Sequence, residues 1–178
     1  MSELWVRPGE QEDVAAIAAI YAHHVRSGTG SFETEAPDAS EMQRRRAAMV
    51  GQGFPYLVAE SEGVLVGYAY AGPYRARPAY RNTVENSVYV RPDAMRQGIG
   101  RMLLERLVEE CAARGFRQMI AVVGDSGNLA SIRLHERAGF RLIGVLRSVG
   151  WKHGRWLDTV LLQRALGDGD VHEPALPA

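Results

Sequence analysis

The chain has 178 residues, of which 46% are hydrophobic, and its 21 basic and 21 acidic side chains balance. This length predicts one globular domain that buries about 70% of its unfolded surface. The charge balance gives no indication of a nucleic-acid partner. No apolar run is long enough to span a membrane, and the first residues lack the pattern of a signal peptide, so we expect a cytoplasmic protein.

Cysteine and histidine usage argues against a metal site. One cysteine excludes an intrachain disulfide and a cysteine-rich site, and Cys111 lies on an apolar helix stripe, which predicts a core residue. The adjacent His23 and His24 point in different directions on a helix, and no carboxylate-rich partner is spaced to join them. We therefore expect no metal and a solvated or structural role for both histidines.

The first half of the chain predicts strands and helices in alternation. Hydrophobic spacing indicates, in chain order, a strand at residues 4–7, helices at 14–25 and 40–50, and a β-hairpin of strands 56–60 and 64–70. The arginines at 44–46 are expected to form a solvated face of the second helix.

Polar residues then gather in a loop and on the strand that follows it. Residues 72–81 form a proline-punctuated loop with three arginines and two tyrosines, and this composition fits a ligand-binding loop and a solvated surface loop equally well. Residues 83–90 predict a central strand that carries the consecutive polar residues Glu85, Asn86 and Ser87. Buried polar groups cost free energy unless they are partnered or functional.

The next segment, residues 89–101, leaves that strand, turns at a proline and enters an amphipathic helix. Gly98 and Gly100 allow the backbone to curl around an anion at the start of the helix, and Arg96 and Arg101 are suited to phosphate. We interpret this segment as a pyrophosphate cradle. The third glycine of a dinucleotide fingerprint and the Gly-Lys-Ser/Thr of a triphosphate loop are missing, and the alternative is an ordinary strand-to-helix turn.

The remainder predicts a strand at 117–123, a helix from about Leu129 to Ala138, and two strands at 140–149 and 157–163 joined through residues 150–156. Residues after Leu166 are rich in glycine, proline and acids, so we expect a disordered tail at 167–178 behind one domain at 1–166.

This order of elements, with the cradle and an Asn-led helix at 128–140 that ends in Gly-Phe, resembles the GCN5-related N-acetyltransferase (GNAT) family over about residues 4–166. The resemblance implies a single-domain α/β (α+β) fold whose mixed, mostly antiparallel sheet has about seven strands and about four flanking helices. It also implies acetyl-CoA as cosubstrate, a small-molecule acceptor and a homodimer.

The family motifs imply which residues bind the coenzyme. The pyrophosphate would be held by Arg96, Gln97, Gly98, Ile99, Gly100 and Arg101. The pantetheine arm would run beside Val88, Tyr89 and Val90, and Asn128 would hydrogen-bond the coenzyme. Met95 stands where the family usually has Gln or Arg, which puts one side-chain contact in doubt.

Three segments point to a subfamily. His135 replaces a tyrosine found in many members, and together with residues 80–90 and 150–156 it is similar to the phosphinothricin and methionine sulfoximine acetyltransferases. This similarity implies acetylation of the α-amino group of a small amino acid or analogue such as phosphinothricin, methionine sulfoximine or methionine sulfone.

Acetyl transfer to an amine requires a neutral nucleophile, so a base must remove a proton. Glu85 is the predicted base, because burial on a central strand should raise its pKa; the alternative is a structural ion pair with a loop arginine. His135 is the second candidate, either as another base or as the acid that protonates the leaving thiolate, and the alternative is a structural helix histidine. The resemblance also implies that a backbone N–H near Val88 polarises the thioester carbonyl beside a strand irregularity.

Arg75 and Arg77 suit the carboxylate or phosphinate of the acceptor, since a guanidinium binds such groups bidentately. Asn86 and Ser87 would orient its amine or carboxylate, and Phe32 and Lys152 are further candidates that could reach a site across a dimer interface. Two alternatives stay open: acetylation of a polyamine, antibiotic or protein N-terminus, and a non-catalytic coenzyme A sensor. The loop arginines argue against a polyamine, and the presence of both Glu85 and His135 argues against a sensor.

Overall fold

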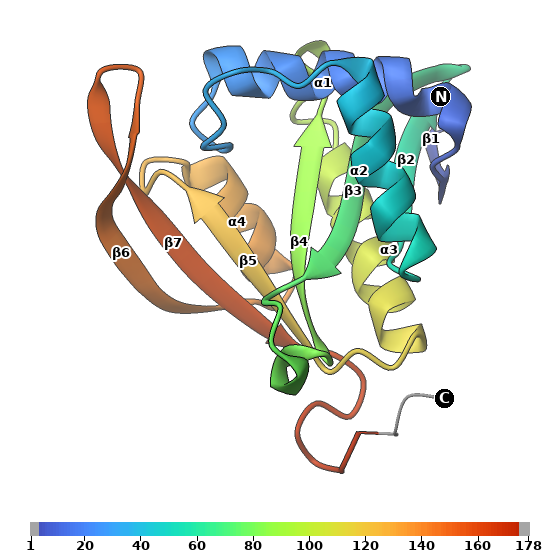
Figure 1. Cartoon of the computed structure of the whole chain (residues 1–178), viewed down its shortest axis with the longest axis vertical. Helices are drawn as coiled ribbons and strands as arrows, with labels where there is room; N and C mark the ends of the chain where they lie inside the picture. Colours follow the sequence, from blue (N-terminus) through green and yellow to red (C-terminus); the bar gives the residue numbers. More distant parts are fainter. Residues whose placement is uncertain (1–3, 175–178) are drawn as a thin grey trace.

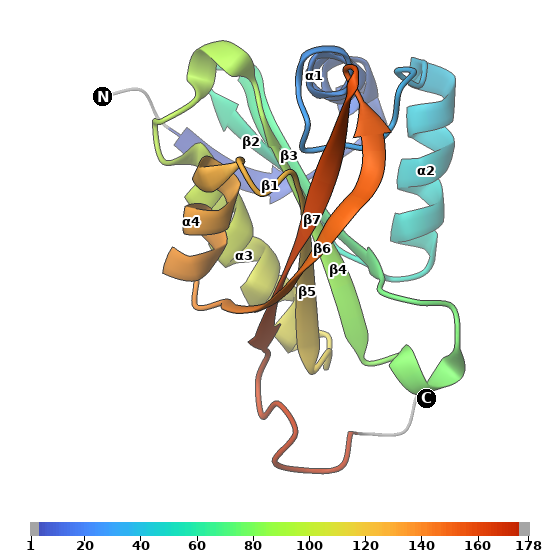
Figure 2. The same ribbon diagram turned by 90° about the vertical axis from the view of Figure 1, so that its left-hand side faces the viewer.

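A twisted sheet with helices on both faces forms the framework of the computed structural model, which describes residues 4–174 (Figures 1 and 2). Its seven strands lie in the order β1-β2-β3-β4-β5-β7-β6, and only β4 and β5 are parallel neighbours. The strands are β1 (Leu4–Pro8), β2 (Tyr56–Ser61), β3 (Val64–Pro73), β4 (Thr83–Val90), β5 (Gln118–Gly124), β6 (Arg141–Lys152) and β7 (Arg155–Ala165). The helices are α1 (Val14–Ser27), α2 (Ala39–Gly51), α3 (Ile99–Ala113) and α4 (Leu129–Arg137).

Strand alternation sends side chains into two separate cores. Leu57 and Ala59 of β2 pack with α3, whereas Tyr56 and Val58 of the same strand pack with α1. The helices α1 and α2 therefore cover one face of the sheet, and α3 and α4 cover the other (Figure 2). Cys111 is fully buried on α3, as predicted.

The expected sheet and helices are confirmed, but the predicted long connection at residues 150–156 is wrong. β6 continues to Lys152 and β7 resumes at Arg155, so the connection is the two residues His153 and Gly154. Both have positive φ, at 52° and 72°, which is the backbone of the tight hairpin turn that matches the twist of paired strands. Trp151 and Trp156 are paired across the two strands, and their rings meet edge to face with centroids 5.2 Å apart.

The parallel pairing of β4 with β5 is short. It joins residues 83–86 to residues 118–121 and ends at the pair Asn86 and Ala121. Beyond this point β4 pairs only with β3 and β5 only with β7, so the two strands diverge (Figure 1). We call this point, with the β4 edge of residues 87–90, the fork.

The loop between α1 and α2 (residues 28–38) contacts the end of β5 and the β6–β7 hairpin. Thr29 Oγ1 donates to Asp125 Oδ2 at 3.0 Å, and Lys152 Nζ donates to the Ser31 carbonyl at 2.7 Å. The ring of Phe32 lies against Gly124 and Gly150, where a Cβ at either position would collide with it. The loop thus joins the α1–α2 layer to β5 and the β6–β7 hairpin.

The chain after β7 stays close to the sheet as far as it is described. Leu166 is 1% exposed, and the Arg117 guanidinium donates to the carbonyls of Gly169 and Glu173. Residues 175–178 of the predicted disordered tail lie outside the described residues. Among residues 4–174, no helix is both long and apolar enough to cross a membrane.

Replacing Gly124 by Ala should detach the loop from β5, because the new Cβ would overlap the backbone carbonyl of Thr29. We expect a loss of about 1–3 kcal/mol in the free energy of unfolding, measured by urea titration. The matched control is Gly144→Ala on β6, where a Cβ meets no atom within 4 Å. Equal stability of the two variants would contradict this account of loop attachment.

Candidate active site

The polar residues of β4 lie at the fork and point to opposite faces of the sheet. Asn86 is on the α3–α4 face, where its Nδ2 lies 2.9 Å from Nε2 of His135. Glu85 and Ser87 point to the α1–α2 face, where Ser87 hydrogen-bonds Tyr70. Because β4 has no β5 partner beyond Asn86, these groups lie where a ligand can approach the strand edge.

Glu85 is half-buried on the α1–α2 face. Burial raises the pKa of its carboxyl above the ordinary value. Within the described part of the chain it has no ion pair, so the alternative of a structural pair with Arg75 or Arg77 finds no support. A carboxylate with a raised pKa and no fixed partner has the properties of a general base.

His135 is a buried histidine of α4 with both ring nitrogens occupied. Its Nδ1 lies 2.8 Å from the Ser131 carbonyl and its Nε2 meets Asn86. Burial lowers the pKa of the imidazole, and the Ser131 carbonyl acts in the opposite direction. His135 is 4% exposed. Because it contacts Asn86, whose side chain points away from the face of Glu85, His135 and Glu85 lie on opposite sides of the sheet.

The predicted cradle lies between the fork and α3. Gly98 is the N-cap of α3 with φ of 83°, and no side chain among residues 4–174 caps this helix end. Arg96, also at positive φ, and Arg101 are exposed, and Arg101 forms an ion pair with Glu105. Free N–H groups and arginines at a helix N-terminus suit an anion.

Two coenzyme candidates have structural partners. Asn128 is the N-cap of α4, and its Oδ1 accepts the Ser131 N–H at 3.3 Å. The Val90 carbonyl meets Nε2 of His24 at 2.8 Å, so His24 is structural. Its ring also contacts Tyr89, and α1 is thereby attached to the end of β4. Val88, the third residue of this edge, is not contacted by His24.

The acceptor-side candidates fall into two groups. Lys152 and Phe32 meet at the α1–α2 loop, and burial lowers the pKa of the Lys152 ammonium while Glu33 opposes that shift. Arg75 and Arg77 are exposed in the loop after β3, where the Arg75 guanidinium lies over the rings of Tyr74 and Tyr80. β3 places Gly72 directly opposite Glu85, so the loop that carries Arg75 and Arg77 begins close to Glu85.

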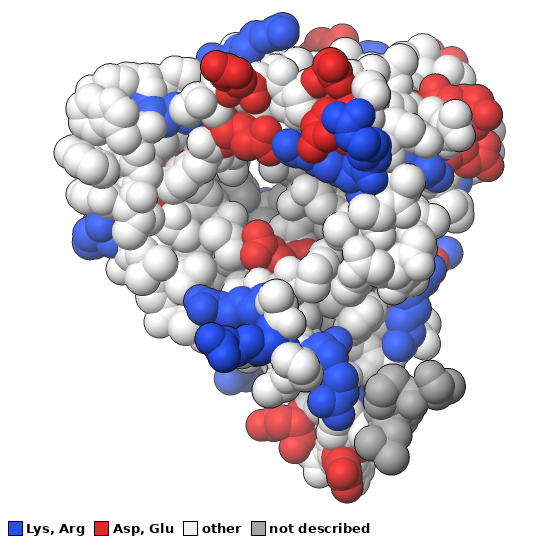
Figure 3. Space-filling model, viewed as in Figure 1, with Lys and Arg blue, Asp and Glu red and all other residues white. Residues whose placement is uncertain are grey.

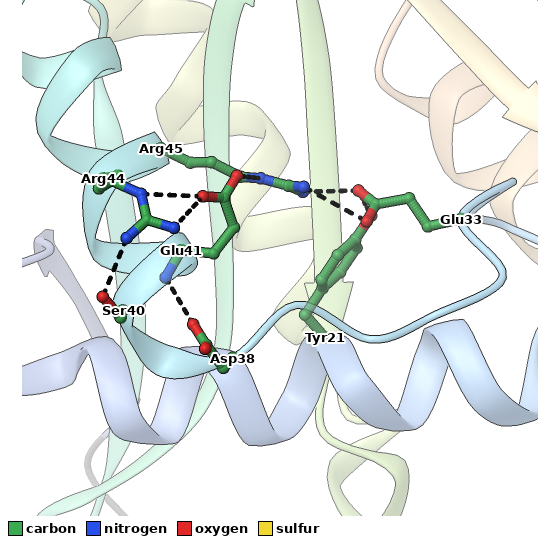
Figure 4. A network of polar contacts seen from close by, with 7 residues as sticks. All are labelled: Tyr21, Glu33, Asp38, Ser40, Glu41, Arg44 and Arg45. Atoms are coloured by element: carbon green, nitrogen blue, oxygen red, sulfur yellow. Dashed lines mark hydrogen bonds and ion pairs between the residues drawn. The ribbon is translucent and has the colours of Figure 1, made fainter.

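A charged network that the sequence did not predict closes the α1–α2 side (Figure 4). Glu33 accepts hydrogen bonds from Tyr21 at 2.8 Å and from Arg45 at 2.5 Å. Arg45 also binds Glu41 of its own helix at 2.8 Å. Arg44 and Arg45 are exposed, as expected for a solvated face, although Arg45 is also ion-paired. The expectation is wrong for Arg46, which is partly buried and donates to the Gly9 carbonyl. The partners of Arg45 and Arg46 are 12 and 37 residues away in the chain, so local sequence patterns do not reveal these contacts.

The charges are distributed unevenly over this face of the molecule. Figure 3 shows acidic side chains within a hollow, basic side chains below it, and acidic and basic side chains together above it. Across residues 4–174, His, Cys, Asp and Glu side chains form no group of three or more that could hold a metal.

Comparison with known proteins identifies the family. A sequence profile described as the acetyltransferase (GNAT) family matches residues 14–140. The chain belongs to this family. Its fold agrees, since a GNAT superfamily phosphinothricin acetyltransferase from Sinorhizobium meliloti, crystallised with AcCoA, superimposes with a TM-score of 0.94 at 44% identity, covering 97% of this chain and 93% of that one.

Two sequence relatives of this GNAT protein are named for the molecules that they acetylate. A phosphinothricin N-acetyltransferase of Alcaligenes faecalis is 57% identical over 95% of this chain and 86% of its own. An L-methionine sulfoximine/L-methionine sulfone acetyltransferase of Pseudomonas aeruginosa is 40% identical over 89% of this chain and 92% of its own. The similarity covers the whole domain, including the α1–α2 loop and the fork.

Replacing Arg45 by Met should loosen the α1–α2 loop, because Glu33 then keeps only Tyr21. We expect amide hydrogen exchange at residues 31–35 to become about fivefold faster, the effect of losing a partly exposed ion pair. The control is Arg44→Met, since Arg44 contacts only Glu41 and Ser40 of its own helix segment. Equal exchange in both variants would exclude the Arg45–Glu33 contact as the loop's attachment.

Proposed function

We propose that this protein transfers the acetyl group of acetyl-CoA to the α-amino group of a small amino acid or analogue, such as phosphinothricin, methionine sulfoximine or methionine sulfone. The observation that carries the proposal is Glu85, a half-buried carboxylate with a raised pKa at the fork of an acetyltransferase fold. The names of the close relatives support this choice of acceptor.

The residues of the cradle and the β4 edge fit the coenzyme. The uncapped N-terminus of α3, with Arg96, Gln97, Gly98, Ile99, Gly100 and Arg101, would hold the pyrophosphate. The unpaired edge at Val88 to Val90 would run beside the pantetheine arm, although His24 already occupies the Val90 carbonyl. Asn128 would contact the coenzyme from the start of α4, and Met95 adds no polar group. Acetyl-CoA supplies the activated acetyl group.

Glu85 would prepare the acceptor. An α-ammonium group must lose a proton before its nitrogen can attack, and a carboxylate with a raised pKa accepts that proton more readily, directly or through a water. The Val88 N–H, which has no β5 partner, would stabilise charge on the thioester oxygen. His135 would assist from the opposite face.

The acceptor would be held by cationic side chains. Arg75 and Arg77 suit its carboxylate or phosphinate, and Ser87, on the same face as Glu85, would orient its amine or carboxylate. Lys152 with Phe32 would close the site from the α1–α2 loop. Asn86, expected to share this role, is directed to the other face, toward His135. These groups favour an anionic amino acid over a polyamine.

A second copy of the chain would cover the edge of the sheet. β6 is an edge strand, and six large apolar side chains on the β6–β7 hairpin are about half exposed or more: Leu142, Ile143, Leu146, Val149, Trp151 and Trp156. Exposed apolar edges invite pairing, so we propose a homodimer through this hairpin.

The proposal is tested by thiol release from acetyl-CoA with phosphinothricin, methionine sulfoximine, methionine sulfone, spermidine, an aminoglycoside and an N-terminal peptide as parallel acceptors. Turnover with the sulfur and phosphorus amino acids alone supports the proposed acceptor class. Turnover confined to spermidine, the aminoglycoside or the peptide overturns the acceptor, and coenzyme binding with no turnover on any acceptor overturns the catalytic role.

Replacing Glu85 by Gln should lower kcat roughly 10²–10⁴-fold, the usual contribution of a general base. In the unsubstituted protein, kcat should fall as the pH drops through the raised pKa of Glu85, because only the carboxylate accepts a proton; the variant should lack this acidic limb. Glu109→Gln, at an exposed site on α3, is the control. A pH profile of the Glu85 variant like that of the unsubstituted protein would remove Glu85 from this role.

Replacing Arg75 by Ala should raise KM for the acceptor by about 10- to 100-fold, since a charged hydrogen-bonding partner is lost. Kd for acetyl-CoA, measured by calorimetry, should stay unchanged. Arg81→Ala removes the same charge from an exposed site in the same loop and should leave both constants as they were. A parallel loss of coenzyme and acceptor affinity would contradict the assignment of Arg75.

A further inference from the structure

Asn86 and His135 form a buried polar pair between β4 and α4. Asn86 is 6% exposed and His135 is 4% exposed, and the two side chains are joined by the 2.9 Å contact between Nδ2 and Nε2. They are 49 positions apart in the chain. In a dry environment every hydrogen bond of such a pair must match a donor with an acceptor.

The matching fixes which nitrogen of His135 carries its proton. The Ser131 carbonyl, 2.8 Å from Nδ1, can only accept, so Nδ1 must be protonated. A neutral imidazole with a proton on Nδ1 has a lone pair on Nε2. Asn86 must therefore present its NH₂ group to Nε2, and this also fixes the orientation of the Asn86 amide.

The same orientation leaves the other half of the amide unsatisfied. Oδ1 of Asn86 is buried and has no hydrogen-bond partner among the described residues. If Nε2 of His135 were protonated, it would become a donor, and a turned amide would then place Oδ1 against it. The pair thus has two internally consistent arrangements, one for each charge state of the imidazole.

We propose that Asn86 is a positioning residue for His135: it holds the imidazole in the Nδ1–H tautomer and turns its amide over when Nε2 takes a proton. This deepens the proposed function, because His135 is one of its two candidate catalytic groups. In the unreacted enzyme, His135 can then accept a proton at Nε2 but cannot donate one from it. The role of acid toward a leaving thiolate becomes available only after that proton is taken.

The amide of Asn86 lies at the proposed active site. Asn86 is the last β4 residue paired with β5, so the change occurs at the fork itself. The charged neighbours Arg133, Glu136 and Arg137 of α4 are exposed, and Glu85 points to the other face of β4. Burial lowers the pKa of His135, in keeping with the neutral arrangement.

Nitrogen NMR of the full-length protein with ¹⁵N-labelled histidine tests the proposal without substrate. The His135 signals are identified by their loss in His135→Gln. Near neutral pH we expect a protonated Nδ1 and an unprotonated Nε2. In Asn86→Asp the carboxylate can only accept, so both nitrogens should be protonated at the same pH. Ser131→Ala, which keeps the backbone carbonyl, should retain the original pattern.

A protonated Nε2 in the unsubstituted protein, or an unprotonated Nε2 in Asn86→Asp, would overturn the proposal. Should the aspartate variant fail to fold, the unsubstituted protein supplies a second readout. The side-chain NH₂ signals of Asn86, identified by their loss in Asn86→Ala, should shift with the same midpoint as Nε2 of His135 as the pH is lowered, because the amide turns over when Nε2 takes a proton. NH₂ signals that do not move while Nε2 titrates would overturn the proposal. A purely structural Asn86 would lower stability without changing either readout. Since no turnover is measured, failure of the thiol-release assay would not affect this result.

Discussion

The short parallel pair of β4 and β5 is the constraint on which the rest of the site depends. Four residues of each strand are joined, and the pairing stops at Asn86 and Ala121. Parallel neighbours require a crossover, and α3 supplies it, so the N-terminus of α3 lies just beyond the free end of β4. The early end of the β4–β5 pairing therefore brings together an unpaired strand edge, a helix end suited to anions and a row of polar side chains.

Strand alternation divides the chemistry of that row between two faces. Glu85 is directed toward α1 and α2, where burial raises its pKa, and the next residue, Asn86, is directed toward α4 and His135. The two candidate catalytic groups are thus separated by the sheet, and the fork is the place where both faces can be reached. A base on one side and a histidine on the other suit a reaction in which an amine and a thioester approach the same strand edge from opposite faces.

The α1–α2 loop joins parts of the molecule that the sheet leaves apart. Glu33 attaches it to Tyr21 and Arg45 on one side, and Thr29 and Ser31 attach it to Asp125 and Lys152 on the other. Members of one fold differ in the molecules they accept mainly through such loops. Family membership accounts for acetyl-CoA as the cosubstrate, and we propose that these loop contacts influence the choice of acceptor.

The sequence by itself determined the elements and the chemical types at the site. Local periodicity located the seven strands and four helices of residues 4–174, the glycine turn before α3 and the polar row at Glu85, because these depend on neighbours in the chain. Only the tertiary structure decided which side chains meet: Asn86 with His135 and Arg45 with Glu33 pair across 49 and 12 residues. It also decided the His153–Gly154 turn, whose left-handed backbone is imposed by the pairing of β6 with β7. Such contacts follow from strand register and helix placement, which periodicity does not encode.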